Sequence, residues 1–210
     1  MKQQEDARMR LLHAGMAVFA EVGFHAATTR EISRRAEVNL AAIHYYFADK
    51  AGLYRAVFAL PFAEQGNVFA QVDIESATLE EALSCFYQWI LPPAERAEEV
   101  MLQKFMQLHA REEADPSGIL GDALSEHIKP NHEKLKQLLC RELGKLEPDL
   151  AIEQLAFAIM GMASAFVHGR RVVEVLAPEL IHGKNASDVR LQRLIGYAKT
   201  LIDAERGQHE

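Results

Sequence analysis

A short stretch of the chain, from Asn39 to Phe47, places small, aromatic and hydrogen-bonding side chains at helical spacing. With about 100° of rotation per residue, Ile43 and Phe47 share one face, which is expected to be buried. Tyr45 and the alanines before Ile43 then point roughly the other way, and His44 lies on a flank. Phenol, imidazole and methyl groups on an exposed helix can meet base edges and phosphates. The spacing is therefore compatible with a helix that contacts DNA, and equally with one whose tyrosines pack on other helices.

The flanking residues predict two short helices joined by a tight turn, followed by a third helix. Thr28 and Glu31 have the spacing of a capping box at the start of the first short helix. Asn39 is a good N-cap for a second helix from Leu40 to Phe47, and Asp49 caps the next one. A helix as short as the second is unstable alone in water, so it must pack on its neighbours.

The charge of the chain is unevenly distributed. The whole chain carries a formal charge of −7, but residues 1–55 contain eight basic and six acidic side chains, a balance of +2, which leaves −9 for the remainder. Because acidic surfaces repel phosphate, only the first segment is suited to approach DNA. Few phosphates would be neutralised, so we expect a moderate salt dependence of binding.

The segment from Leu12 to Leu53 resembles the TetR-type transcriptional repressors. It reads LLHAGMAVFAEVGFHAATTREISRRAEVNLAAIHYYFADKAGL and has the family's apolar spacing, its Gly23-Phe24 helix end, its threonine pair and its Tyr-Tyr-Phe ending before Lys50. The stretch NLAAIHYYFADKAGLYRAVF is most similar to the branch with a CecR-like C-terminal domain. Glu37 stands where the family usually has a glycine in the turn, and a left-handed backbone there costs Glu more than Gly.

The resemblance implies a set of DNA-binding residues. Arg30 matches a position that reaches a base edge, where its guanidinium suits the acceptors of guanine. Arg34 and Arg35 fit solvated surface charge at least as well as DNA contact. The recognition-helix positions are Leu40, Ala41, Ala42, His44 and Tyr45, which follow the N-cap Asn39, and the phosphate-contacting positions are Thr28, Thr29, Tyr46 and Lys50.

The rest of the sequence predicts an all-α protein with two domains. Residues 1–48 form the helix-turn-helix domain, and residues 49–210 form a larger helical domain for ligand binding and dimerisation. Later helices are expected from Thr78, from Glu95 to about Arg111, from Leu120 to Leu143 with a bend or break at Pro130, from Pro148 to about Leu176, and from Ser187 to Ala204. No alternating pattern typical of strands is present.

The larger domain contains aromatic and methionine side chains that could line a pocket for a small-molecule effector. Each one is more often a core residue, so the prediction concerns the group. Its members are Phe86, Trp89, Met101, Phe105, His109, Met162, Phe166 and His168.

Small residues along one predicted helix indicate a homodimer, with a monomer as the alternative. Ala158, Gly161, Met162, Ala165 and Phe166 form an apolar strip that permits close helix approach, and the helix Leu191–Ile202 is its expected companion. A two-fold dimer would present two recognition helices to a pseudo-palindromic double-stranded DNA operator, with half-sites roughly 34 to 36 Å apart.

Other features narrow the class of protein. The N-terminus lacks the apolar stretch of a signal peptide, and the longest apolar run, Leu155–Val167, is 13 residues against the roughly 20 that span a bilayer. We therefore expect a cytoplasmic protein with no membrane partner. Cys85 and Cys140 lie far apart, which is typical of reduced thiols, and neither a metal nor another cofactor is expected.

Two alternatives remain beside a ligand-released repressor. One is an enzyme, because His127 and His132 flank Lys129-Pro130, and His109 lies near a pair of glutamates. Neither set has the spacing of a zinc motif, and no nucleophile elbow or phosphate-binding glycine loop is present. The other is a helical small-molecule-binding protein without DNA binding.

Overall fold

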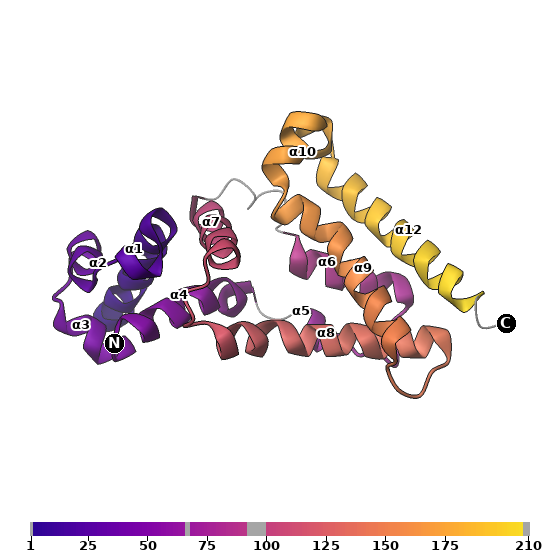
Figure 1. The fold of residues 1–210 in the computed structure, drawn as a ribbon, viewed down its shortest axis with the longest axis horizontal. Helices are drawn as coiled ribbons and strands as arrows, with labels where there is room; N and C mark the ends of the chain where they lie inside the picture. Colours follow the sequence, from indigo (N-terminus) through magenta and orange to yellow (C-terminus); the bar gives the residue numbers. More distant parts are fainter. Residues whose placement is uncertain (1, 66–67, 92–99, 208–210) are drawn as a thin grey trace. The chain divides into compact units, whose positions relative to one another are not determined.

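The structure is a computed structural model that describes residues 2–65, 68–91 and 100–207. These residues form helices without a strand, which confirms the all-α class (Figure 1). The helices are α1 (Lys2–Ala26), α2 (Thr29–Ala36), α3 (Ala41–Phe47), α4 (Lys50–Gln65), α5 (Val68–Gln71), α6 (Leu79–Ile90), α7 (Val100–Ala114), α8 (Gly121–Leu143), α9 (Leu150–Val167), α10 (Arg170–Leu176), α11 (Glu179–His182) and α12 (Ala186–Arg206).

The chain divides into two compact units. The N-terminal unit comprises residues 1–66 and 95–127, and the C-terminal unit comprises residues 67–94 and 128–210. Helix α8 therefore begins in the first unit and ends in the second. The two units are defined by contacts between residues, so α4 and α7 fall in the same unit as α1, α2 and α3. The division of function at residue 48 stays a prediction.

The N-terminal unit is built around α1, against which α2, α4 and α7 pack. Helix α1 breaks at Gly23, whose φ of 77° and ψ of 173° confirm the predicted end of the first helix. A positive φ of this kind strains residues with a side chain, so glycine suits the break. The apolar core of this unit includes Leu11, Met16, Phe19, Ile32, Ile43, Phe47, Leu53 and Val57.

The turn between α2 and α3 has a left-handed backbone at Glu37, although glutamate adopts this conformation at a greater cost than the glycine usual in the family. Glu37 has φ 55° and ψ 43°, and its N–H donates to the carbonyl of Arg34. The next N–H, of Val38, donates to the carbonyl of Ser33 at 3.1 Å. Two terminal carbonyls of α2 are thereby satisfied at the cost of a strained glutamate.

Side-chain caps fix the helix starts. The hydroxyl of Thr28 accepts from the N–H of Glu31, but the predicted capping box is wrong in its second half, because the Glu31 carboxylate turns to Arg34 and Arg35. Asp49 caps α4 through the N–H of Gly52 at 2.7 Å, as predicted. The capping box of Thr78 and Glu81 is complete.

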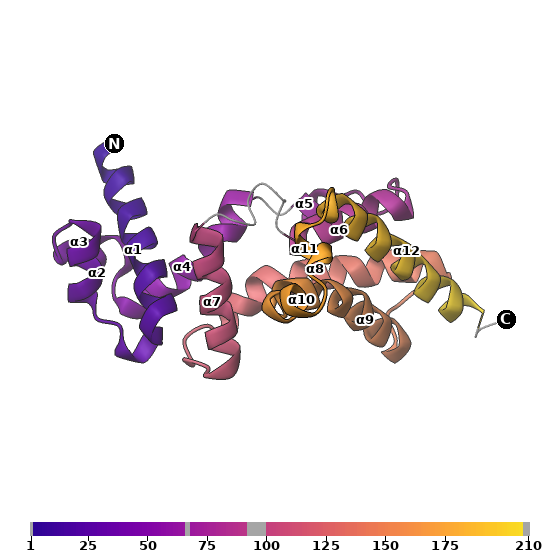
Figure 2. The ribbon, with the colours of Figure 1, turned by 90° about the horizontal axis from the view of Figure 1, so that it is seen from above.

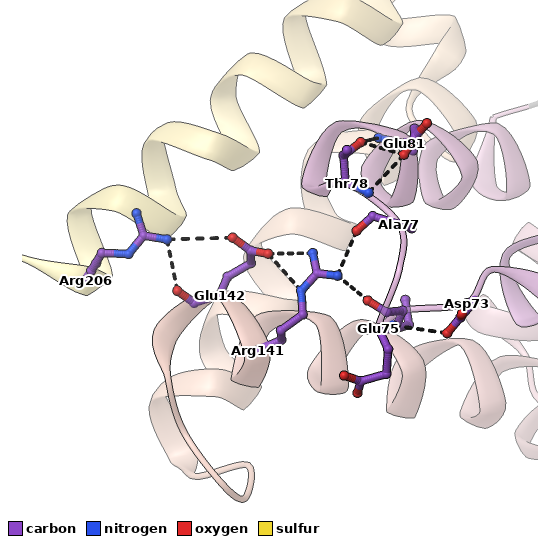
Figure 3. Close-up of polar contacts among 9 residues, drawn as sticks. Asp73, Glu75, Ala77, Thr78, Glu81, Arg141, Glu142 and Arg206 are labelled. Atoms are coloured by element: carbon purple, nitrogen blue, oxygen red, sulfur yellow. Dashed lines mark hydrogen bonds and ion pairs between the residues drawn. The ribbon is translucent and has the colours of Figure 1, made fainter.

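The C-terminal unit packs α6, α9 and α12 together, and Figure 2 gives a second view of these helices. Its core includes Leu83, Phe86, Tyr87, Leu138, Leu139, Ile152, Ile159, Leu194, Ile195 and Ile202. The guanidinium of Arg141 on α8 donates to the carbonyls of Ile74 and Ala77 and pairs with Glu142 (Figure 3). Arg206 on α12 donates to the carbonyl of Glu142 at 2.9 Å. These contacts hold the loop before α6, the end of α8 and the end of α12 together.

One helix prediction needs correction, and another, which left a bend or a break open, is decided against the break. The helix from Pro148 to Leu176 was wrong in length, since α9 ends at Val167 and α10 begins at Arg170. Gly169 lies between them, and a Cβ there would meet the carbonyl oxygen of Ala165 at 2.7 Å, so the backbone comes too close for a side chain. Helix α8 continues through Pro130, so the chain is not split there.

Helix α9 is longer than the apolar run found in the sequence. Its 18 residues from Leu150 to Val167 have a mean hydropathy of 1.7 and, by length and composition alone, could cross a membrane. The packed helices of globular proteins pass the same test, and α9 buries one face through Ile152, Ile159 and Ala163.

Candidate DNA-binding site

Helix α3 has one buried and one exposed face. Ile43 and Phe47 are 1% and 8% exposed, whereas Tyr45 is 73% and Leu40 45% exposed. Ala41 and His44 are also exposed, and the side chain of Asn39 accepts from the N–H of Ala41 at 2.9 Å, which confirms it as the cap. The helix therefore offers a phenol, an imidazole and a methyl group to solvent.

Two of the predicted residues are less exposed than the helix spacing suggested. Ala42 and Tyr46 are half-buried and pack against the core of the N-terminal unit. The Tyr46 ring lies edge to face with that of Tyr45, with ring centres 4.8 Å apart. This packing limits the freedom of the exposed Tyr45 ring, so less entropy is lost when it binds.

The imidazole of His44 is held by its own helix end. Its Nδ1 lies 2.6 Å from the carbonyl oxygen of Ala48. Because a carbonyl oxygen only accepts, Nδ1 donates, and Nε2 of the neutral ring is then an acceptor. The side chain thus presents a defined hydrogen-bonding edge.

The cations on α2 fall into two kinds. Arg34 and Arg35 both bond to the carboxylate of Glu31, at 2.8 Å each, and Arg35 also pairs with Glu21 at 2.8 Å. The hydrogen bonds from Arg34 and then Arg35 lower the pKa of Glu31 from 4.5 to about 2. Arg30 is exposed and, within the described ranges, has no carboxylate partner. The charges of Arg34 and Arg35 are compensated by carboxylates, while the charge of Arg30 remains available for an external partner.

Lys50 donates hydrogen bonds to backbone carbonyls of the N-terminal unit, a role that sequence reasoning missed. Its Nζ lies 2.9 Å from the carbonyl oxygen of Phe24, 3.0 Å from that of Ala27 and 3.4 Å from that of His25. It also lies 4.4 Å from the centre of the Phe24 ring. The ammonium caps the end of α1 and joins it to the start of α4, so a contact with phosphate would compete with these carbonyls.

The two threonines lie at the N-terminus of α2. The Thr28 hydroxyl is used in the cap, and Thr29 is half-buried at the first position of the helix. A helix N-terminus favours anions such as phosphate, so their predicted role is compatible with this placement.

The eight predicted pocket residues divide between the two units. Met101, Phe105 and His109 lie in the N-terminal unit, where the first two pack on its core. Phe86 belongs to the buried core of the C-terminal unit, and Trp89, Met162 and Phe166 are partly buried and pack against that core. His168 is exposed. Most of these residues therefore pack in or against a hydrophobic core, as aromatic and methionine side chains of helical proteins usually do.

The N-terminal unit contains a cavity of about 260 Å³, which we call the α4–α7 cavity. Of the eight predicted residues, His109 lines it. Among the described residues, its lining is Phe58 from α4, His109, Glu112 and Glu113 from α7, and Pro116, Gly118, Leu120 and Gly121 from the turn into α8. Sequence reasoning missed Phe58, since a phenylalanine in an amphipathic helix gives no sign that one side of its ring faces a void.

Comparison with known proteins identifies the class. A model of the tetR family of bacterial regulatory proteins matches residues 11–57, and one of the C-terminal domain of the HTH-type transcriptional dual regulator CecR matches residues 80–202. The chain belongs to the TetR family of bacterial regulatory proteins, in the branch with a CecR-type C-terminal domain. It is thus a DNA-binding transcriptional regulator and not an enzyme.

Individual relatives agree with this assignment. The chain is 29% identical over 180 residues to the dual regulator CecR of Shigella flexneri, covering 80% of this chain and 79% of the relative. It is 30% identical over 167 residues to the regulator BetI of Serratia proteamaculans (strain 568), covering 74% and 78%. The solved structure of a SmeT–triclosan complex shares the fold, with a TM-score of 0.63, 21% identity and coverage of 91% and 90%.

Proposed function

We propose that this regulator represses transcription by placing α3 in the major groove of an operator. The exposed face of α3, with Tyr45 at its centre and Ile43 and Phe47 buried behind it, is the observation that carries this proposal. A short helix docked on a rigid core is the usual reader of the major groove in helix-turn-helix proteins. The compensated arginines of α2 imply that few basic groups add non-specific attraction.

The exposed groups support particular base contacts. Arg30 suits the O6 and N7 acceptors of guanine, and the methyl group of Ala41 suits the methyl group of thymine. The acceptor Nε2 of His44 suits an exocyclic amino group of adenine or cytosine. Thr28, Thr29, Tyr46 and Lys50 are proposed phosphate contacts, with Lys50 weakest because its ammonium already has three carbonyl partners.

A homodimer formed through α9 and α12 is the proposed form on DNA. Ala158, Gly161 and Ala165 are exposed on α9, and a Cβ added at Gly161 or at Gly196 of α12 would meet no atom within 4 Å. Exposed small residues on two adjacent helices permit close approach of the same helices from a second copy. Two-fold symmetry would then match a pseudo-palindromic operator.

The α4–α7 cavity is the proposed effector site of a cytoplasmic regulator. It lies within the same compact unit as α3, and Phe58 on α4 forms part of its wall. A ligand that binds one arrangement of α4 better than another shifts the population between DNA-competent and DNA-incompetent forms. A coupling of about 1 to 3 kcal/mol suffices for release. SmeT, which shares the fold, is known in complex with triclosan.

Selection from random duplexes by the purified protein tests this function. We expect enrichment of a pseudo-palindrome whose half-sites lie one helical turn apart, roughly 34 to 36 Å. Enrichment of a single, unrepeated half-site would contradict the dimer. A protein that enriches no sequence yet binds small molecules would instead be a helical binding protein without DNA recognition.

A further inference from the structure

The first part of α1 places an arginine beside the recognition helix α3. The guanidinium carbon of Arg8 lies 5.5 Å from the centre of the Phe47 ring, and Phe47 is the last residue of α3. The face of an aromatic ring attracts positive charge, so this contact holds the guanidinium in place. Arg8 therefore brings a positive charge from another helix to the C-terminal end of α3.

The charge of Arg8 is available for an external partner. Its side chain is exposed, and none of the described carboxylates forms an ion pair with it. The Phe47 ring carries no net charge, so the ring contact leaves the charge of Arg8 uncompensated. Arg10 differs, because its Nε lies 3.6 Å from the carboxylate of Asp6 and its Nη1 donates to the carbonyl of Glu37 at 3.4 Å. Arg10 is thus bound to the turn before α3, whereas Arg8 can still meet an anion.

The cation that follows α3 in the sequence is already occupied. Lys50 begins α4, and its ammonium lies within 3.4 Å of the carbonyl oxygens of Phe24, His25 and Ala27. A phosphate would have to compete with these acceptors for the ammonium. Binding through Arg8 requires no such exchange, so Arg8 is the better suited cation at this end of α3.

Groups beside an inserted helix meet the phosphates that border the groove. The major groove is roughly 12 Å wide, so a helix at its centre has a sugar-phosphate backbone about 6 Å from its axis on each side. In helix-turn-helix proteins, a helix that supports the reader crosses that backbone. The exposed guanidinium of Arg8 contacts the last residue of α3, and it therefore lies within reach of a phosphate when α3 enters the groove.

We propose that Arg8 binds an operator phosphate at the C-terminal end of α3 and so fixes how that helix lies in the groove. A guanidinium can donate two parallel hydrogen bonds to phosphate oxygens, which gives direction as well as attraction. A phosphate contact carries no sequence information by itself, so Arg8 is a positioning residue. This inference rests on the proposed function of α3, and it adds a contact from α1.

The salt dependence of DNA binding by the full chain tests the role of Arg8. Arg8→Gln should lower the affinity several-fold for the selected operator and for random duplex alike, because both lose one phosphate contact. The logarithmic slope of affinity against salt should become shallower by about 0.9 for each subunit bound. Arg8→Lys keeps the charge and should restore most of the slope. An unchanged slope in Arg8→Gln, or a loss of affinity confined to the operator, would overturn the proposal.

Thermal unfolding separates this role from a structural one. Arg8 is exposed, so Arg8→Gln should leave the melting temperature nearly unchanged. A lower melting temperature with an unaltered salt slope would mean that the guanidinium serves to cover Phe47 and does not bind phosphate.

Lys104→Gln is the matched control for net charge. It removes one positive charge from α7 of the same unit, and α1 lies between α3 and α7 in both views (Figures 1 and 2). This variant should keep the wild-type slope. Equal changes of slope in Lys104→Gln and Arg8→Gln would reflect net charge alone and contradict a contact by Arg8.

Tyr45→Ala on the same operator distinguishes failure of this inference from failure of the proposed function. If Tyr45→Ala weakens binding and Arg8→Gln keeps the wild-type slope, α3 reads DNA and the role of Arg8 is wrong. If neither variant changes binding, α3 does not enter the groove and both proposals fail.

Discussion

The two compact units differ in the kinds of side chain that they expose to solvent. In the N-terminal unit, the large exposed apolar and aromatic side chains at α3 are Leu40, directly before the helix, and Tyr45 within it. His44 and Arg30 are exposed as well, and Arg30 pairs with no carboxylate among the described residues. In the described part of the C-terminal unit, large apolar side chains crowd the surface of α9 to α12, and they are Leu150, Phe157, Val172, Val175, Leu176, Leu180, Val189 and Tyr197. A mixed polar and aromatic surface suits DNA, whereas an exposed apolar surface of this extent suits another protein chain.

The largest effect is expected from substitutions in the exposed apolar surface of the C-terminal unit. Gly161→Gln and Gly196→Gln each place a long side chain where the present fold has open space, so each should fold normally but prevent close approach of a second copy. Operator affinity should fall by about 100-fold or more, since a monomer loses the gain from bivalent binding. Sedimentation measures the mass and anisotropy the affinity.

Gly161→Ala is the matched control for these variants, because one methyl group adds little bulk. It should keep the dimer mass. A glutamine variant that remains dimeric and binds the operator normally would show that α9 and α12 do not form the contact.

The next effect separates the two kinds of arginine on α2. Arg30→Ala should weaken operator binding by about 1 to 3 kcal/mol, which is on the order of tenfold to a hundredfold, because its exposed guanidinium pairs with no carboxylate in the part of the chain that the structure describes. Arg34→Gln should change operator affinity by less than about threefold, because the guanidinium of Arg34 is already paired with the carboxylate of Glu31. Equal losses in the two variants would contradict the assignment of Arg30 as the base-reading cation.

A smaller effect follows from the carboxylate that holds Arg34 and Arg35. Glu31→Gln should release Arg34, while Arg35 keeps its ion pair with Glu21, and should steepen the salt dependence of DNA binding by up to roughly one logarithmic unit per tenfold change in salt. Competition with random duplex DNA at several salt concentrations measures this. An unaltered slope would mean that the released Arg34 does not reach phosphate.

The same substitution has a defined pH dependence. The folded-state pKa of Glu31 is about 2, below its ordinary value of 4.5, so its pairing stabilises the fold above pH 4.5 and loses that contribution as the pH falls toward 2. The difference in melting temperature between the wild type and Glu31→Gln should therefore be present at neutral pH and shrink below pH 4.5. A difference that is constant down to pH 3 would refute the pairing.

The smallest effect concerns the strained turn. Glu37 has a φ of 55°, and relieving this strain with Glu37→Gly should raise the free energy of unfolding by about 0.5 to 1 kcal/mol, net of the greater entropy of glycine in the unfolded chain. Urea unfolding measures the change. Glu37→Ala is the control, since alanine keeps the strain and should give no gain in stability.

Sequence reasoning predicted the helices of the helix-turn-helix segment well because their signals are local. The spacing of Ile43 and Phe47 and the caps at Asn39 and Asp49 each depend on a few neighbouring residues. The partners of Glu31 were mistaken because the capping box and the arginine pairs are both local patterns that compete for one carboxylate.

The cavity and the role of Lys50 could not be predicted, because both depend on distant contacts. Lys50 reaches carbonyls more than twenty positions earlier, and Phe58 meets a turn about sixty positions later. The break at Gly169 was missed because apolar spacing continues across it, and only the close approach to Ala165 shows why glycine is required.

The most direct test of the central claim compares Tyr45→Ala with Phe47→Ala on the selected operator. Tyr45 is 73% exposed, so its loss should weaken operator binding by about tenfold and leave the melting temperature nearly unchanged. Phe47 is buried, so its loss should lower the free energy of unfolding by about 3 to 5 kcal/mol. If Tyr45→Ala binds the operator as tightly as the wild type, or loses stability in proportion to binding, the exposed face of α3 does not read DNA.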